Sequence, residues 1–151
     1  MQAVILCGVQ GSGKTSFYLG RFFATHVRIS LDMLRTRRRE RLLLDACLAA
    51  QQPFVVDNTN PTRREREPYL RAAADARFRA LGYYFDATRS EAIARNQARP
   101  KRERIPVAGI LGTFKRLERP RLDEGFDALY RVTIDPDRGF AVAPLDEPPE
   151  P

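Results

Sequence analysis

The sequence predicts an α/β fold in which a parallel sheet of about five strands is flanked by helices. Short apolar segments rich in β-branched and aromatic residues alternate along the chain with longer amphipathic segments, as strands and helices do in such folds. A glycine-rich segment separates the first apolar segment from the first amphipathic one. A basic stretch later in the chain adds the expectation of a basic helical lid.

The expected elements alternate along the whole chain. Strands are predicted near residues 2–7, 26–29, 53–57, 78–86 and 129–134. Helices are predicted near residues 14–24, 31–50, 61–76, 89–98 and 107–119. Because right-handed crossovers bring the loops after parallel strands to one edge of the sheet, we expect the functional residues at that edge.

Size and composition predict a single domain with a core. The chain has 151 residues, of which 43% are hydrophobic, within the range of globular domains. We expect residues 1–140 to form this domain. Residues 141–151 contain four prolines and no basic residue, which predicts a disordered acidic tail.

The sequence also gives indications of the compartment. Cys7 and Cys47 lie in apolar segments, as is typical of small core residues in a reducing compartment. No stretch approaches the roughly 18 apolar residues of a membrane span, and a strand directly after Met1 leaves no room for a signal peptide. We therefore expect a cytoplasmic protein without a membrane partner. His26 is the only histidine, so histidine-based catalysis is not expected.

Residues 8–15 read Gly-Val-Gln-Gly-Ser-Gly-Lys-Thr, which is the G-x-x-x-x-G-K-[ST] pattern of a phosphate-binding loop. In such a loop the backbone N–H groups cradle phosphates, the lysine reaches the β- and γ-phosphates, and the hydroxyl ligates Mg²⁺. The sequence therefore predicts a P-loop NTPase-type sheet, with ATP and Mg²⁺ as cofactors. The predicted nucleotide-binding residues are Gly8, Gly11, Ser12, Gly13, Lys14 and Thr15, of which Thr15 is also a predicted metal ligand. The alternative is a glycine-rich turn with a solvated lysine.

Asp32 and Arg35 follow the second predicted strand and, being three residues apart, share one face of a helical turn. A carboxylate at this edge can accept a proton from an acceptor hydroxyl, and an arginine can hold a phosphate of the acceptor. Asp32 is therefore a predicted catalytic and substrate-binding residue, and Arg35 a predicted substrate-binding residue. The spacing is equally compatible with a helix N-terminus in which Asp32 satisfies the dipole and Arg35 forms a surface ion pair.

Asp57 ends the third predicted strand, after an apolar segment. In phosphate-loop proteins a carboxylate at such a strand end commonly supports Mg²⁺, so Asp57 is a second predicted metal residue. The alternative is a strand-ending turn, because the aspartate, asparagine and proline types found here all favour turns.

The net charge of +7 favours an anionic partner. Only three of the 26 basic residues are lysine, and a compositional bias would explain that arginine excess equally well. Arg95 and Arg99 share a helix face, and arginines on a lid could neutralise charge on a transferring phosphoryl group. The basic clusters at 37–41 and 63–64 are compatible with phosphate-backbone contacts or with solvated helix faces.

Over most of residues 1–135 the chain resembles the kinase domain of polynucleotide 5′-hydroxyl kinases, the phage and bacterial end-healing enzymes and the kinase half of the animal kinase–phosphatase. The phosphate-binding loop is shared with many NTPases and is not specific to this family. The more specific motifs are Asp32-x-x-Arg35, the segment 55–61, Arg95-Asn96-x-x-Arg99 followed by Ile105-Pro106, and the segment 124–127.

The resemblance implies a role for each matching residue. Lys14 and Thr15 would bind the donor phosphates and Mg²⁺, and Asp32 would be the general base on the 5′-hydroxyl. Arg35 would hold the phosphate on the 3′ side of the acceptor. Arg99 would contact the donor phosphates from the lid as a catalytic residue, with Arg95 as a weaker second ligand.

The predicted function is thus ATP-dependent phosphoryl transfer to the 5′-hydroxyl end of DNA or RNA, as in nucleic acid repair. One alternative is a P-loop kinase of a small-molecule alcohol or nucleoside. Another is a non-catalytic, ATP-dependent nucleic-acid-binding module. The sequence leaves open the choice between DNA and RNA, the choice between ATP and GTP, and whether copies of the chain form a homo-oligomer.

Overall fold

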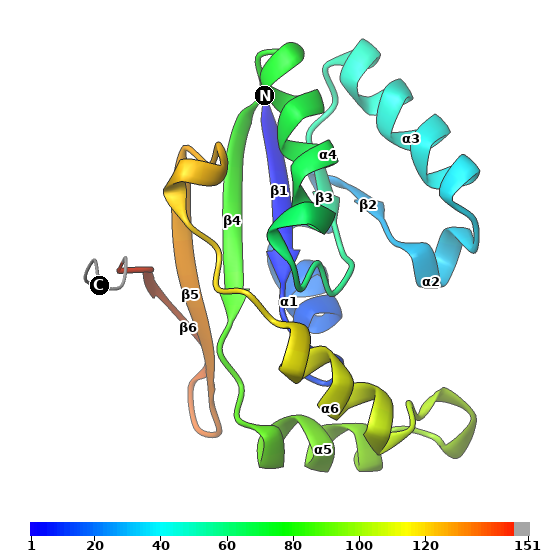
Figure 1. Ribbon diagram of the computed structural model, residues 1–151, viewed down its shortest axis with the longest axis vertical. Coiled ribbons are helices and arrows are strands. Elements are labelled where there is room, and N and C mark those ends of the chain that lie inside the picture. The colour runs from blue at the N-terminus through cyan, green and yellow to red at the C-terminus, as the bar shows by residue number, and fades with distance from the viewer. Residues whose placement is uncertain (147–151) are drawn as a thin grey trace.

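The computed structural model describes residues 1–146, which form a six-stranded sheet with helices on both faces (Figure 1). The strand order is β2-β3-β1-β4-β5-β6, and the first five strands are parallel. The strands are β1 (Gln2–Cys7), β2 (Val27–Ile29), β3 (Phe54–Val56), β4 (Arg79–Phe85), β5 (Ala128–Asp135) and β6 (Gly139–Pro144). The predicted α/β fold is confirmed, with one strand more than expected.

The connections between the parallel strands are helical. The helices are α1 (Lys14–Arg21), α2 (Leu31–Leu34), α3 (Arg37–Ala50), α4 (Arg63–Asp75), α5 (Arg89–Ala98) and α6 (Val107–Arg116), with 3-10 turns η1 (Lys101–Glu103) and η2 (Leu122–Glu124). Within residues 1–146 no helix has both the length and the apolar character that crossing a bilayer requires.

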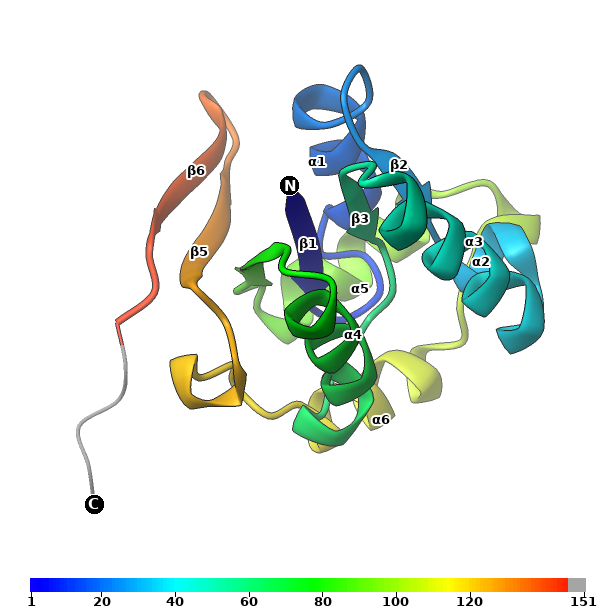
Figure 2. The ribbon, with the colours of Figure 1, turned by 90° about the horizontal axis from the view of Figure 1, so that it is seen from above.

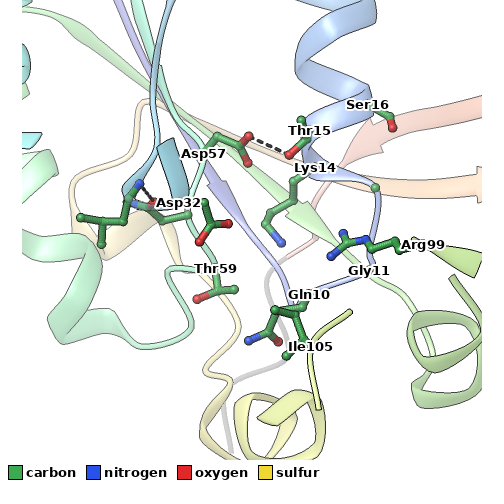
Figure 3. A pocket seen from close by; sticks show the side chains of 13 residues that line it. Gln10, Gly11, Lys14, Thr15, Ser16, Asp32, Asp57, Thr59, Arg99 and Ile105 are labelled. Atoms are coloured by element: carbon green, nitrogen blue, oxygen red, sulfur yellow. Dashed lines mark hydrogen bonds between the residues drawn. The ribbon is translucent and has the colours of Figure 1, made fainter. Parts of the chain in front are cut away.

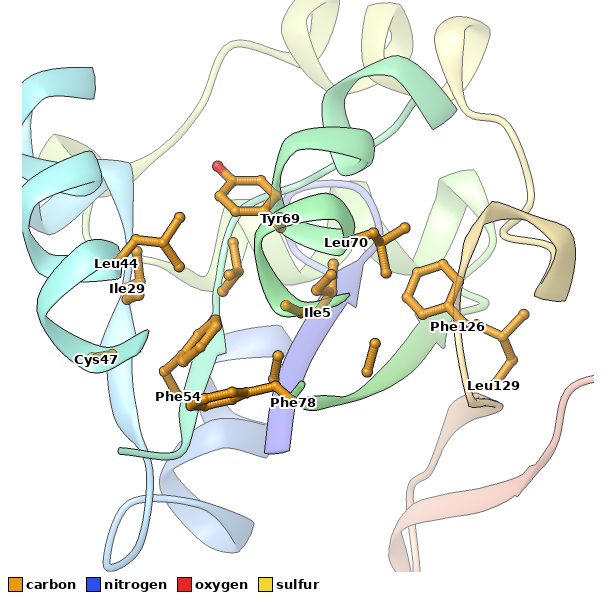
Figure 4. Packing of buried hydrophobic residues seen from close by; sticks show 14 of the residues in the cluster. Ile5, Ile29, Leu44, Cys47, Phe54, Tyr69, Leu70, Phe78, Phe126 and Leu129 are labelled. Atoms are coloured by element: carbon orange, nitrogen blue, oxygen red, sulfur yellow. The ribbon is translucent and has the colours of Figure 1, made fainter. Parts of the chain in front are cut away.

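Two apolar layers hold the helices to the sheet. Ala3 and Ile5 of β1 face the layer under α3 and α4, which Figure 4 shows, whereas Val4 and Leu6 face the layer under α1. Figure 2 shows α1 and α4 on opposite sides of β1. Because a central parallel strand is buried on both faces, its sequence is continuously apolar rather than alternating.

The helix expected over residues 31–50 is interrupted. Arg35 ends α2 with a φ of 74°, a left-handed conformation that a non-glycine residue rarely adopts. Thr36 then begins α3 as its N-cap, because its hydroxyl accepts a hydrogen bond from the Arg39 N–H at 3.2 Å. The break separates α2, the one-turn helix that carries Asp32, from α3, the long helix that follows it in the chain.

The end of the chain differs from the disordered tail expected from residue 141. Residues 139–144 form β6, which pairs antiparallel with β5. The hairpin is favoured by the Asp135 carboxylate, which accepts from the backbone N–H groups of Asp137 and Arg138, and by Gly139 with a φ of 78°. Pro144 is tolerated because it ends an edge strand. Residues 147–151 of the expected tail lie outside the described part of the chain.

Candidate active site

A cavity of about 290 Å³ lies where β1, β2 and β3 end. Its walls come from the phosphate-binding loop, the start of α2, the loop after β3, and the segment between α5 and α6 (Figure 3). The lining residues are Gln10, Gly11, Gly13, Lys14, Thr15, Ser16, Leu31, Asp32, Asp57, Asn58, Thr59, Arg99 and Ile105. The cavity therefore unites residues that lie up to 95 positions apart, from Gln10 to Ile105.

The glycines of the loop have two different roles. Gly11 and Gly13 have φ angles of 77° and 95°, so they need the freedom that glycine gives the backbone. Gly8 has no positive φ angle and is needed for another reason. A Cβ atom at position 8 would lie 2.8 Å from the Phe85 Cβ, so Gly8 is required by close packing.

Lys14 is folded back against its own loop. Its Nζ donates to the carbonyl oxygens of Gly8 and Val9 at 2.9 and 2.8 Å, and the residue is only 8% exposed. Burial lowers the pKa of Lys14 to about 8, although the carboxylates of Asp57 and Asp32 partly oppose that shift. An anionic phosphate in the cavity would favour the charged form.

Thr15 and Asp57 meet at the predicted metal position. The Thr15 hydroxyl donates to Asp57 Oδ2 at 3.0 Å, and Arg28 Nε donates to the same oxygen at 2.8 Å. Hydroxyl and carboxylate oxygens are the ligands that Mg²⁺ prefers. Among residues 1–146 no group of three metal-ligating His, Cys, Asp or Glu side chains exists. The two residues therefore fit Mg²⁺ only in combination with phosphate and water oxygens, which is how this ion is usually held beside a nucleotide.

Asp32 and Arg35 differ in their placement. Asp32 lines the cavity, and in Figure 3 the Lys14 side chain lies between Asp32 and Arg99. Within residues 1–146 no hydrogen bond or ion pair engages the Asp32 carboxylate, which leaves it available to an incoming group. Arg35 is exposed and is not part of the cavity wall formed by the described residues.

The two arginines predicted for the lid, Arg95 and Arg99, also differ in their placement. Arg99 lines the cavity, whereas Arg95 is not part of the wall formed by residues 1–146. The loop that carries Arg99 is held by Asn96, which is fully buried and bonds both backbone groups of Ile105, at 2.6 and 2.9 Å. The lid helices pack against the phosphate-binding loop through a cluster centred on Val9, Ala92 and Ile110.

Several cavity residues were not predicted as site residues. In the wall they are Gln10, Ser16, Leu31, Asn58, Thr59 and Ile105, and behind the wall lies Arg28, which was not predicted either. Asn58 and Thr59 follow Asp57 at a strand end, and that placement alone was a usable signal. Arg28 lies on a strand, and nothing in its local sequence indicates that it meets Asp57.

The fold is shared with several solved structures. The gluconokinase from Sinorhizobium meliloti 1021 is 19% identical over 87% of this chain and 82% of that one, with a TM-score of 0.63. Chaetomium thermophilum Kti12, solved in complex with ADP-AlF3, is 19% identical over 90% and 91%, with a TM-score of 0.64. The Mycobacterium tuberculosis APS kinase CysC, in complex with AMPPNP and APS, is 19% identical over 91% and 90%, with a TM-score of 0.55.

These likenesses show a P-loop NTPase-type fold and do not by themselves assign an activity or a substrate. The AAA domain family matches residues 4–120, which is well over half of the sequence. The chain therefore belongs to the AAA domain family.

Proposed function

We propose that this protein is an ATP- and Mg²⁺-dependent kinase of a small-molecule alcohol or nucleoside. The observation that carries the proposal is the placement of Asp32, a carboxylate that makes no hydrogen bond or ion pair among residues 1–146, in the same cavity as Lys14 of the phosphate-binding loop. A switch protein that only binds nucleotide has no need of a base at this place. The cavity of about 290 Å³ lies at the low end of ligand pockets, which suits a phosphate chain and a small acceptor.

The proposed reaction assigns one role to each wall of the cavity. The loop N–H groups and Lys14 hold the β- and γ-phosphates of ATP. Thr15 and Asp57 would hold Mg²⁺, which supplies charge neutralisation when bound. The oxygen of the acceptor hydroxyl bonds to the γ-phosphorus while Asp32 accepts the hydroxyl proton. The bond between the γ-phosphorus and ADP breaks, and ADP leaves. Arg99 stabilises the charge on the transferring group from the lid.

The fold relatives support a small acceptor. Two of the three solved proteins described above are named as kinases of small molecules, one of gluconate and one bound to APS. The expectation of a nucleic acid acceptor therefore becomes the second candidate.

That second candidate is phosphorylation of a 5′-hydroxyl end of DNA or RNA. A specific observation favours it: Arg35 is exposed next to the helix that carries Asp32, and the side chains of Arg37 and Arg41 are 68% and 67% exposed nearby on α3. These cations could contact the phosphates of a longer acceptor.

A panel of acceptors with γ-labelled ATP tests both candidates. The panel contains sugars, sugar acids, nucleosides and adenylyl sulfate, and 5′-hydroxyl oligonucleotides of DNA and RNA, with GTP as an alternative donor. We expect label transfer to a small alcohol and none to the oligonucleotides, with loss of transfer in Asp32→Ala. Transfer to oligonucleotides alone would establish the second candidate. Nucleotide binding without transfer to any acceptor would argue against both.

A further inference from the structure

The one-turn helix α2, which carries Asp32, is poorly supported by its own sequence. A single helical turn fixes several backbone angles for very few hydrogen bonds and is unfavourable by itself. The Ser30 hydroxyl at its N-cap makes no capping bond, is buried, and has no partner among the described residues. At the other end, Arg35 leaves the helix in a left-handed conformation. The position of Asp32 must therefore be set from outside α2.

Asn58 provides that external support. The backbone N–H of Leu31, the first residue of α2, donates to Asn58 Oδ1 at 2.9 Å. In an ordinary N-cap, a side-chain oxygen accepts a hydrogen bond from a backbone N–H group in the first turn of the helix. Here the cap comes from a residue 27 positions away, in the loop after β3.

The orientation of the Asn58 amide is fixed by its other partners. Its Nδ2 donates to Glu40 Oε2 at 2.9 Å and approaches the Tyr69 hydroxyl at 3.3 Å. An ionised carboxylate only accepts hydrogen bonds, so the amide nitrogen has to face Glu40. The amide oxygen is thereby directed at the Leu31 N–H.

Glu40 and Tyr69 are themselves anchored between α3 and α4. The Tyr69 hydroxyl donates to Glu40 Oε1 at 2.8 Å, and Arg37 donates to the same oxygen at 3.0 Å. Glu40 is 5% exposed and Tyr69 is 4% exposed. Burial and the neighbouring carboxylate raise the pKa of Tyr69 to about 12, so its hydroxyl keeps its proton at neutral pH. A buried network of this kind is rigid when every member has a partner.

We propose that Asn58 is a positioning residue, which holds the start of α2 so that Asp32 faces the acceptor, and that Glu40 orients the Asn58 amide. The catalytic part of this inference rests on the proposed kinase function. The structural part, that Asn58 holds the Leu31 N–H, stands independently of it.

The first test is Asn58→Ala. We expect kcat to fall by about 10- to 100-fold, because small displacements of a catalytic group are costly, while the Kd of a non-hydrolysable ATP analogue stays within about two-fold. The matched control is Gln52→Ala, which removes a side-chain amide away from the cavity, whose Nε2 donates to the backbone carbonyls of Thr25 and Pro53. The control should leave kcat unchanged.

The sharper test exchanges donor and acceptor between the two side chains. Asn58→Asp alone places two carboxylates opposite each other. In Glu40→Gln alone, the new amide oxygen takes over the bonds from Tyr69 and Arg37, so the new amide nitrogen faces the amide nitrogen of Asn58. Each single variant should lose kcat. The double variant Asn58→Asp/Glu40→Gln restores one donor facing one acceptor and should recover most of kcat. If Asn58 and Glu40 only stabilised the fold, the single variants would lower the free energy of unfolding and leave the kcat of the folded protein unchanged.

Amide hydrogen exchange of Leu31 tests the structural part of the proposal separately from the catalytic part. In Asn58→Ala its exchange should accelerate by about ten-fold or more, since the bond that protects it is removed. Unchanged exchange would overturn the structural part, and a kcat within two-fold of wild type would overturn the catalytic part. If the wild-type protein transfers phosphate to no acceptor, the proposed function and the catalytic part fail, while the exchange measurement still decides whether Asn58 holds α2.

Discussion

The donor side and the acceptor side of the cavity are built in opposite ways. On the donor side, Lys14 and Ser12 bond to carbonyl groups only three to six residues away, all within the phosphate-binding loop. On the acceptor side, the bonds that join Asn58 to Leu31 and to Glu40, and Tyr69 to Glu40, span 18 to 29 residues. The phosphate-binding loop is held by local bonds, to which the Thr15–Asp57 bond adds a long-range contact, whereas the acceptor side is assembled by the packing of α3 and α4.

This difference explains how one fold can serve different acceptors. A contiguous loop that binds phosphates tolerates few changes, because its glycines and lysine are fixed by backbone geometry. A wall assembled from separate elements can change one side chain at a time without disturbing the nucleotide. Variants on the two sides should therefore produce separable effects on nucleotide affinity and on phosphoryl transfer.

The largest effect is expected for Asp32→Ala. Loss of a general base should lower kcat by roughly 10²- to 10⁴-fold, while the Kd of ATP remains nearly constant because Asp32 is on the acceptor side. Steady-state kinetics with the best acceptor of the panel, combined with calorimetric ATP binding, measures the separation. Transfer at the wild-type rate would remove Asp32 from the mechanism.

Gly11→Ala should break the donor side alone. A Cβ at position 11 would lie 2.5 Å from the Ala92 carbonyl oxygen, and the φ of 77° is unfavourable for alanine. We expect the free energy of unfolding to fall by about 1 to 3 kcal/mol and ATP affinity to weaken. The exchange rate of the Leu31 amide should not change. Chemical denaturation and hydrogen exchange measure both.

Gly112→Ala is the matched control for that substitution. Gly112 lies inside α6, and a methyl group added there would meet open space, since among the described residues no heavy atom other than those of its chain neighbours and of the nearby backbone of α6 comes within 4 Å. Alanine there should raise the free energy of unfolding by up to about 1 kcal/mol through helix propensity. Equal destabilisation by both substitutions would contradict the steric argument for Gly11.

The pH dependence of nucleotide binding should report on Lys14. Its pKa is lowered from 10.5 to about 8 by burial, so the free protein loses the Lys14 charge as the pH rises through 8. ATP affinity should then fall by about ten-fold for each further pH unit, because only the charged form pairs with the phosphates. Calorimetry between pH 7 and pH 10 measures the trend.

The same shift affects the stability of the nucleotide-free protein. Because the pKa of Lys14 is lower in the folded state than in the unfolded state, the unfolded state binds more protons between pH 8 and pH 10.5, and stability should rise over that range. Lys14→Met should lose both this rise and the fall in ATP affinity. A flat profile in the wild type would show that Lys14 stays charged in the free loop.

The smallest effect is expected at Arg35, which is exposed outside the cavity wall formed by the described residues. For an oligonucleotide acceptor, Arg35→Ala should raise the acceptor KM by roughly two- to ten-fold, the scale of an exposed charge contact, without changing ATP affinity, whereas the KM of a small acceptor inside the cavity should not change. Arg35→Gly should cause the same loss but gain about 1 kcal/mol of stability over Arg35→Ala, because its φ of 74° suits glycine. Equal losses of acceptor and ATP affinity would contradict the placement of Arg35 on the acceptor side.

The local chemistry of this protein was predictable from its sequence. The apolar segments specify the five parallel strands, and the consecutive residues 8–15 specify the phosphate-binding loop, because both depend on neighbours along the chain. Asp32 and Asp57 could be placed at the cavity because strand ends in a parallel sheet share one edge. The break at Arg35 and the sixth strand were missed, since a cap at Thr36 and a hairpin after Asp135 compete with the longer patterns around them.

Only the tertiary structure decided which partners remote in sequence the residues of the site have. Arg28 reaches Asp57 because β2 and β3 are adjacent in the sheet, and Asn58 reaches Leu31 and Glu40 because α3 and α4 pack over the same face. Arg99, rather than Arg95, lines the cavity because Asn96 fixes the loop at Ile105. Such pairings depend on distances between residues that are remote in sequence, and a linear pattern of residue types contains no measure of those distances.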